Sequence, residues 1–114
     1  MREFVKIHKA LSDPHRLRIL KMLEMRSLCV CEITAVLNLA TSTVSKHLAI
    51  LREANLIVDF KEGKWVNYRL NQNRYPSYAQ EILKLLQHWL PSDETITRDK
   101  RLADKVDRHQ LCSR

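Results

Sequence analysis

The spacing of apolar residues predicts helices over most of the chain. Apolar side chains recur every three or four residues, which is the repeat of a helix with one buried face. The predicted helices cover 2–11, 14–26, 31–37, 42–54 and 77–90. Asp13 before Pro14 is a typical helix start, and we expect Ser42 to cap the fourth helix.

The pattern changes between the fourth and fifth helices. Two runs, 56–61 and 65–70, alternate and are rich in β-branched and aromatic residues, with Gly63 between them. Such runs around a glycine turn predict a β-hairpin. The order ααααββα is mainly α with one small hairpin. We interpret helices three and four as a helix-turn-helix and the hairpin as a wing, so that residues 1–91 form a winged helix-turn-helix domain.

The charged tail, residues 92–114, has few apolar positions and is expected to be either helical or disordered. The chain has no run of about 18 apolar residues, which a membrane helix needs. Its N-terminus also lacks the apolar core of a signal peptide. We therefore expect no membrane partner and a cytoplasmic location.

The formal net charge of +7 favours nucleic acid as a partner, with an anionic membrane second. The start of the fourth helix combines short hydroxyl side chains with cationic ones, which suits a helix that enters the major groove. The expected contacts with double-stranded operator DNA are Thr41, Ser42, Thr43, Ser45, Lys46 and His47 in this helix, and Lys61 and Lys64 in the wing. Arg16 and Arg52 are further candidates for phosphate contacts. The alternative is that these residues only solvate a helix start and an exposed turn.

Three cysteines, Cys29, Cys31 and Cys112, are an odd number, which argues against a structural disulfide framework. Thiolates are preferred ligands of soft ions, and a helix N-terminus lowers a thiol pKa. Residues two apart on a helix lie about 200° apart, so one ion could bind both Cys29 and Cys31 only by distorting the first turn of the third helix. That distortion would shift the fourth helix. The alternatives are two small buried hydrophobes and, for Cys112, a free tail thiol.

Three blocks of sequence resemble the ArsR/SmtB family of metal-responsive repressors: 10–20, 42–57 and 61–70. The resemblance implies a winged-helix homodimer that represses its own operon and leaves the DNA when it binds a metal ion. In the family the first and fifth helices form the dimer interface. The apolar faces around Phe4, Ile7, Leu85 and Trp89 are compatible with this role.

The sequence Cys29-Val30-Cys31 resembles the inducer site of the arsenical and antimonial repressors of this family. This resemblance implies As(III) or Sb(III) as the inducer, bound by Cys29 and Cys31. The third cysteine of that pattern is replaced by Thr34, which leaves Cys112 as the candidate third ligand. The paired Asp and His ligands that zinc sensors of the family carry on the fifth helix have no counterpart here.

Two other functions compete with metalloid sensing. In a redox-sensing repressor, Cys29 and Cys31, or one of them with Cys112, would form a disulfide. A thiol enzyme would need an acid–base partner for the cysteine. The sequence has neither a phosphate-binding glycine loop nor a nearby Cys–His pair, so we expect no enzyme and no enzymatic cofactor.

Overall fold

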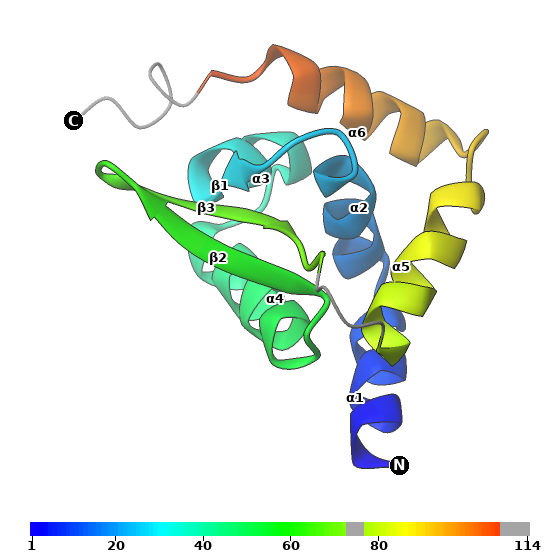
Figure 1. The fold of residues 1–114 in the computed structure, drawn as a ribbon. Coiled ribbons are helices and arrows are strands. Elements are labelled where there is room, and N and C mark those ends of the chain that lie inside the picture. The colour runs from blue at the N-terminus through cyan, green and yellow to red at the C-terminus, as the bar shows by residue number, and fades with distance from the viewer. Residues whose placement is uncertain (73–76, 108–114) are drawn as a thin grey trace.

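The computed structural model describes residues 1–72 and 77–107 (Figure 1). Within these ranges the elements are α1 (Arg2–Leu11), α2 (Pro14–Leu23), β1 (Leu28–Cys29), α3 (Val30–Leu37), α4 (Thr41–Glu53), β2 (Ile57–Glu62), β3 (Trp65–Leu70), α5 (Tyr78–His88) and α6 (Glu94–Lys105). The predicted fold class, a mainly helical winged helix-turn-helix with a β-hairpin, is confirmed. The boundaries of the predicted elements differ from the observed ones by at most three residues.

Helix α2 starts as the sequence predicts. The Asp13 carboxylate accepts hydrogen bonds from the backbone N–H groups of His15 at 2.8 Å and Arg16 at 3.2 Å, and Pro14 takes the first helical position. These bonds satisfy amides that have no partner within the helix.

The predicted cap of α4 by Ser42 is wrong. The helix begins one residue earlier, at Thr41, and its N-cap residue is Ala40 in an extended conformation. Alanine has no side-chain acceptor, so the first amides of α4 have no cap from this residue. A helix start of this kind leaves N–H groups for an anion.

Helix α5 ends earlier than the predicted residue 90, because Trp89 is already extended. The buried ammonium of Lys21 in α2 donates to the backbone carbonyls of Leu86 at 2.8 Å and Trp89 at 2.9 Å. A cation that binds the last carbonyls favours the end of a helix at that point. Lys21 thereby joins the end of α5 to α2.

The sheet has the antiparallel order β1-β3-β2. The predicted hairpin is confirmed, with Ile57 opposite Leu70 and Gly63 at φ +60 in the turn. Strand β1 was not predicted. It has two residues and pairs Cys29 with Asn67 of β3, which brings the cysteine segment against the base of the wing.

The core lies between α1, α2, α3, α4, α5 and the sheet. Its fully buried large side chains include Ile7, Ile19, Leu20, Met22, Leu28, Ile33, Val44, Leu48, Leu51, Leu56 and Ile57. Each such side chain stabilises the fold by about 1.5–3 kcal/mol relative to exposure. No helix among the described residues is long and apolar enough to cross a bilayer.

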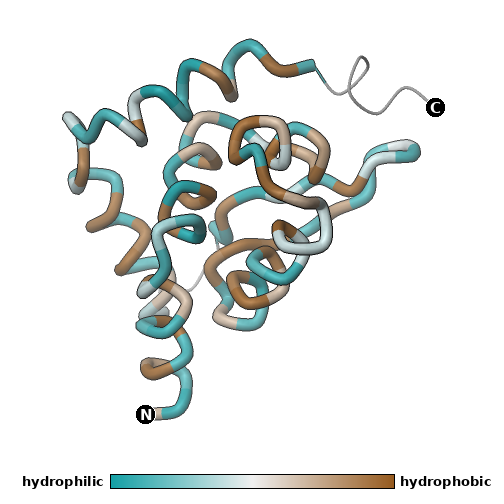
Figure 2. Tube along the Cα trace, turned by 180° about the vertical axis from the view of Figure 1, so that it is seen from behind, coloured by the Kyte–Doolittle hydropathy of each residue, from teal (hydrophilic) through white to brown (hydrophobic). Residues whose placement is uncertain are grey.

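Of the two states expected for the tail, residues 94–105 adopt the helical one, α6. Figure 2 shows this helix as mostly hydrophilic, yet it packs across α2 and α3 and buries Ile96, Asp99 and Ala103. Asp99 binds Arg18 of α2 through both carboxylate oxygens. Polar anchors therefore supplement the thin apolar stripe. Residues 108–114 lie outside the described part of the chain.

Candidate DNA interface and cysteine site

The start of α4 presents polar side chains on an apolar support. Val44, Leu48 and Leu51 are buried and fix the helix against the core. Five of the predicted contacts are exposed: Thr41, Ser42, Thr43, Ser45 and Lys46. The structure thus leaves one face of α4 free for a groove, with short side chains that let the helix axis come close to base edges.

His47, the sixth predicted contact in α4, lies at the junction with α2 instead. Its Nδ1 is 3.2 Å from Nη1 of Arg16, and its ring centroid is 5.7 Å from that of His15. Burial lowers the pKa of His47, and the charges of Arg16 and His15 act in the same direction, against that of Asp13. Because a guanidinium can only donate, His47 Nδ1 is the acceptor in this contact.

Arg16 and Arg52, the extra phosphate candidates, both have protein partners. Arg16 donates to the carbonyls of Lys9 and Ala10 at the end of α1. Its role in the structure is to join α1, α2 and α4. Arg52 pairs with Asp59 of β2 at 3.1 Å on an exposed surface, where such pairs contribute little.

The two lysines predicted to contact DNA from the wing are both accessible to solvent. Lys61 and Lys64 are exposed at the end of the hairpin. The Lys64 ammonium lies 4.9 Å from the centroid of the Trp65 ring, within the range of a cation–π interaction. This interaction keeps the Lys64 side chain near strand β3.

Cys29 occupies a different environment from the one predicted. It lies before α3, in extended backbone, and is the N-cap residue of that helix. The Glu32 carboxylate accepts the Cys29 N–H at 3.0 Å, and the Cys29 side chain faces the Glu32 N–H in return. This is a capping box with a cysteine in the place of serine or threonine. The expectation that both cysteines lie on one helix is therefore wrong.

The Cys29 thiol is also not activated. It is free and only 2% exposed. Burial raises its pKa, and the neighbouring Glu32 carboxylate raises the pKa as well, against the backbone N–H groups of Glu32 and Cys31. The expectation that the helix N-terminus favours the thiolate at Cys29 is wrong, because desolvation and a nearby negative charge outweigh the helix dipole.

Cys31 lies in the first turn of α3, is partly exposed and is disulfide-bonded. Cys112 lies outside the described residues. The hydroxyl of Thr34, one turn further along α3, is buried without a hydrogen-bond partner. Among residues 1–72 and 77–107 no group of three Cys, His, Asp or Glu side chains could hold a metal ion.

Arg26 connects the cysteine segment to α6, and this connection was not predicted from the sequence. One of its nitrogens, Nη2, lies 3.1 Å from Glu32 Oε2, 2.9 Å from the Ala103 carbonyl and 3.3 Å from the Val106 carbonyl. Beside this junction is a polar hollow of about 380 Å³. The spacing Cys29-x-x-Glu32 was a usable signal for the role of Glu32, since an acid three residues after an N-cap is typical of a capping box.

Comparison with known proteins gives the family. The model of the arsR family of bacterial regulatory proteins matches residues 13–58, which contain α2, α3 and α4. The arsenical resistance operon repressor of Escherichia coli K12 is 41% identical over 80 residues, which are 69% of this chain and 68% of the relative. The chain belongs to the arsR family. Its members are DNA-binding transcriptional regulators, and this chain is accordingly a DNA-binding transcriptional repressor and not an enzyme.

Two further relatives support the same assignment for this arsR-family chain. The arsenic resistance transcriptional regulator ArsR1 of Pseudomonas putida is 37% identical over 109 residues, covering 91% of this chain and 80% of the relative. The structure of reduced HlyU from Vibrio cholerae superposes with a TM-score of 0.66 at 32% identity, over 79% of this chain and 90% of HlyU. The relatives therefore include arsenical resistance regulators and a protein studied in a defined redox state.

Proposed function

We propose that this chain is a homodimeric repressor that leaves its operator when As(III) or Sb(III) binds the Cys29 and Cys31 thiolates. The observation that carries the proposal is the position of Cys29 as the N-cap of α3. A ligand that draws Cys29 and Cys31 together acts directly on the start of the helix that supports α4.

The donor chemistry fits the inducer, because two cysteine sulfur atoms with one residue between them suit a soft metalloid ion. The geometry requires rearrangement. Cys29 is buried and its backbone pairs with Asn67, whereas Cys31 projects from the first turn of α3. Two-point binding would loosen this pairing and the capping bond to Glu32. The reduced form of Cys31 is required, since only a thiolate binds the ion.

Helices α3 and α4 pack against each other, so a shift at the start of α3 changes the orientation of α4. The ligand then lowers the affinity for DNA, and by reciprocity DNA lowers the affinity for the ligand. Cys112 remains the proposed third ligand.

The proposed contacts with operator DNA are Thr41, Ser42, Thr43, Ser45, Lys46, Lys61 and Lys64. His47 is a further proposed contact, with the DNA backbone, in addition to its contact with Arg16 at the junction of α2 and α4. The exposure of the first seven supports this role. The N-terminal amides of α4, which have no cap from Ala40, add a site for a phosphate.

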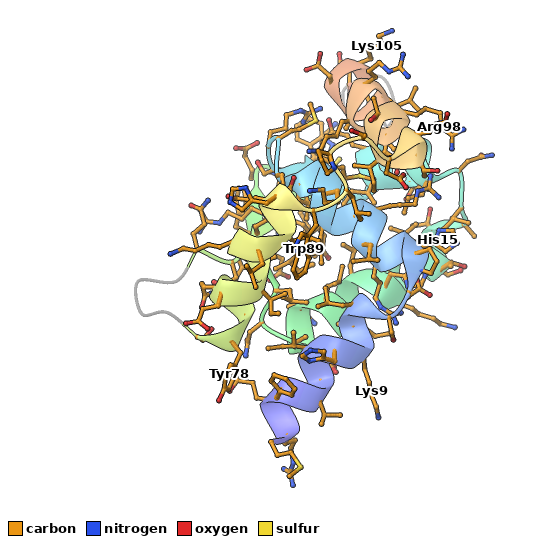
Figure 3. The ribbon with its side chains drawn as sticks, turned by 90° about the vertical axis from the view of Figure 1, so that its right-hand side faces the viewer. Lys9, His15, Tyr78, Trp89, Arg98 and Lys105 are labelled. Carbon is orange, nitrogen blue, oxygen red and sulfur yellow. The ribbon has the colours of Figure 1, made fainter. Side chains whose placement is uncertain are left out.

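The proposed dimer forms through α1 and α5, whose outer faces expose large apolar side chains. Phe4 is 46%, Tyr78 54%, Leu85 50% and Trp89 48% exposed, and Figure 3 shows Tyr78 at the end of α5 that lies beside α1. Within the protomer, the rings of Phe4 and Tyr78 pack edge to face, with their centroids 5.7 Å apart. Ile7, expected in this interface, is fully buried within the protomer and cannot contribute.

A redox-sensing repressor is the second candidate. The bonded state of Cys31 favours it, as does the similarity to HlyU in its reduced form. In this case oxidation at Cys31 would be the signal, and Cys29 would stay a buried thiol.

One titration separates the two candidates. The protein is bound to a fluorescent duplex of its own promoter, and anisotropy is followed while arsenite is added in reducing buffer, or peroxide without reductant. Metalloid sensing predicts release by arsenite and little release from a Cys29→Ser protein. Release by peroxide alone, unchanged in Cys29→Ser, would contradict it and favour redox sensing. Lys46→Gln should weaken DNA binding without changing the dimer.

A further inference from the structure

Helix α1 carries three basic side chains on one face. Arg2, Lys6 and Lys9 have the spacing i, i+4, i+7, which places them in one line along a helix. All three are exposed. The neighbouring face of α1 carries Ile7 and Ala10, which are buried in the core. We call the three cations the α1 stripe.

The α1 stripe runs beside α4. At one end, Arg16 donates to the Lys9 carbonyl and contacts His47 in α4. At the other end, Arg2 and Lys6 line a hollow of about 300 Å³ together with residues 53–55 at the end of α4. The two helices are therefore antiparallel neighbours, and Figure 3 shows Lys9 pointing away from the core of the molecule.

The charges of the α1 stripe are not neutralised by ion pairs within the described part of the protomer. None of the three cations forms an ion pair with a described residue. The acids nearby are Glu3 on α1 and Glu53 on α4, which line the same hollow as Arg2 and Lys6 and balance the charge there. Lys9 lies outside that hollow, so the three cations and the two acids together leave a net charge of +1. The other flank of α1 carries Phe4, which faces Tyr78 of α5, so the proposed dimer contact and the α1 stripe lie on different sides of the helix.

We propose that the α1 stripe binds the sugar–phosphate backbone of the same operator duplex, next to the segment that α4 reads. Continuity with α4 and charge complementarity identify the partner as the DNA backbone. Lysine and arginine on a helix outside the groove contact phosphates and carry no sequence information. The stripe would therefore add affinity and fix the orientation of the protein on DNA. This inference rests on the proposed operator binding by α4.

The test compares two double variants that lose the same charge. Lys6→Gln/Lys9→Gln removes two members of the stripe, and Arg101→Gln/Lys105→Gln removes two exposed cations from α6. The binding constants for the promoter duplex and for an unrelated duplex are measured over a range of salt concentrations. The slope of log K against log salt is negative, and each lost phosphate contact reduces its magnitude by about 0.9. Loss of two contacts in each protomer, four in a dimer, therefore reduces the magnitude by about 3.6.

We expect this decrease on both duplexes for the stripe variant, a much smaller one for the α6 variant, and an unchanged preference for the promoter. A wild-type slope in a folded, dimeric Lys6→Gln/Lys9→Gln protein would overturn the inference, and Lys6→Arg/Lys9→Arg should keep the slope. A wild-type protein without preference for its promoter would instead contradict the proposed function, and the slope on unrelated DNA would still test the stripe. Absence of binding to any duplex at low salt would contradict both.

Discussion

The substitution Asp99→Ala tests whether α6 is an integral part of the fold. The Asp99 side chain is 1% exposed, and its two oxygens accept from Arg18 Nε at 2.7 Å and Nη2 at 3.0 Å. The Arg18 side chain is 16% exposed, so alanine at 99 would leave a largely buried guanidinium without this partner. Removal of one partner from a buried pair costs about 3–5 kcal/mol. Since water can reach part of Arg18, we expect the lower end, about 3 kcal/mol.

The assay is urea denaturation followed by circular dichroism at a fixed protein concentration, since a dimer makes stability depend on concentration. Asp104→Ala, an exposed position on the same helix, is the matched control and should change the free energy of unfolding by less than about 0.5 kcal/mol. The double change Arg18→Met/Asp99→Leu should recover most of the loss, because a well-packed apolar pair can replace a buried ion pair. An Asp99→Ala protein as stable as the control would refute the reasoning.

Three further predictions concern single residues. Since Cys29 is buried and its pKa is raised, its thiol in the reduced protein should react with iodoacetamide about tenfold or more slower than in urea-unfolded protein; similar rates would exclude a buried thiol. Because the folded-state pKa of His47 is below its ordinary 6.5, its contribution to stability is present above pH 6.5 and is lost as the pH falls through the folded value. His47→Asn should reduce the loss in urea midpoint between about pH 7 and pH 5, and an unchanged loss would count against this explanation. Gly63→Ala should destabilise the hairpin by about 1 kcal/mol, since φ is +60 with open space around it, and Gly63→Asn should cost less; equal melting temperatures for the two would argue against backbone strain.

The helices and the hairpin could be predicted because their signals are local. The periodic apolar residues, the Asp13-Pro14 start and the glycine turn each act within a few residues of the element they define. The face of α4 that carries Ser42 and Lys46 follows from the same periodicity, because Val44 and Leu48 must point inward.

The cysteine environment could not be predicted because it depends on distant partners. Strand β1 exists only through pairing with β3, about 40 residues further along the chain. This pairing makes Cys29 a buried strand residue. Likewise, α6 looks polar in sequence, and its packing depends on Arg18 and Arg26, far away in the chain. Tertiary contacts of this kind decide which thiols an ion or an oxidant can reach.

The most direct test of the account follows the start of α3 itself. Amide hydrogen exchange is measured on the reduced protein with and without arsenite, in the wild type and in Cys29→Ser. The account predicts that arsenite removes protection from β1 and the first turn of α3 in the wild type alone, at the concentrations that release DNA. Release of DNA with full protection at Cys29 and Glu32 would contradict it.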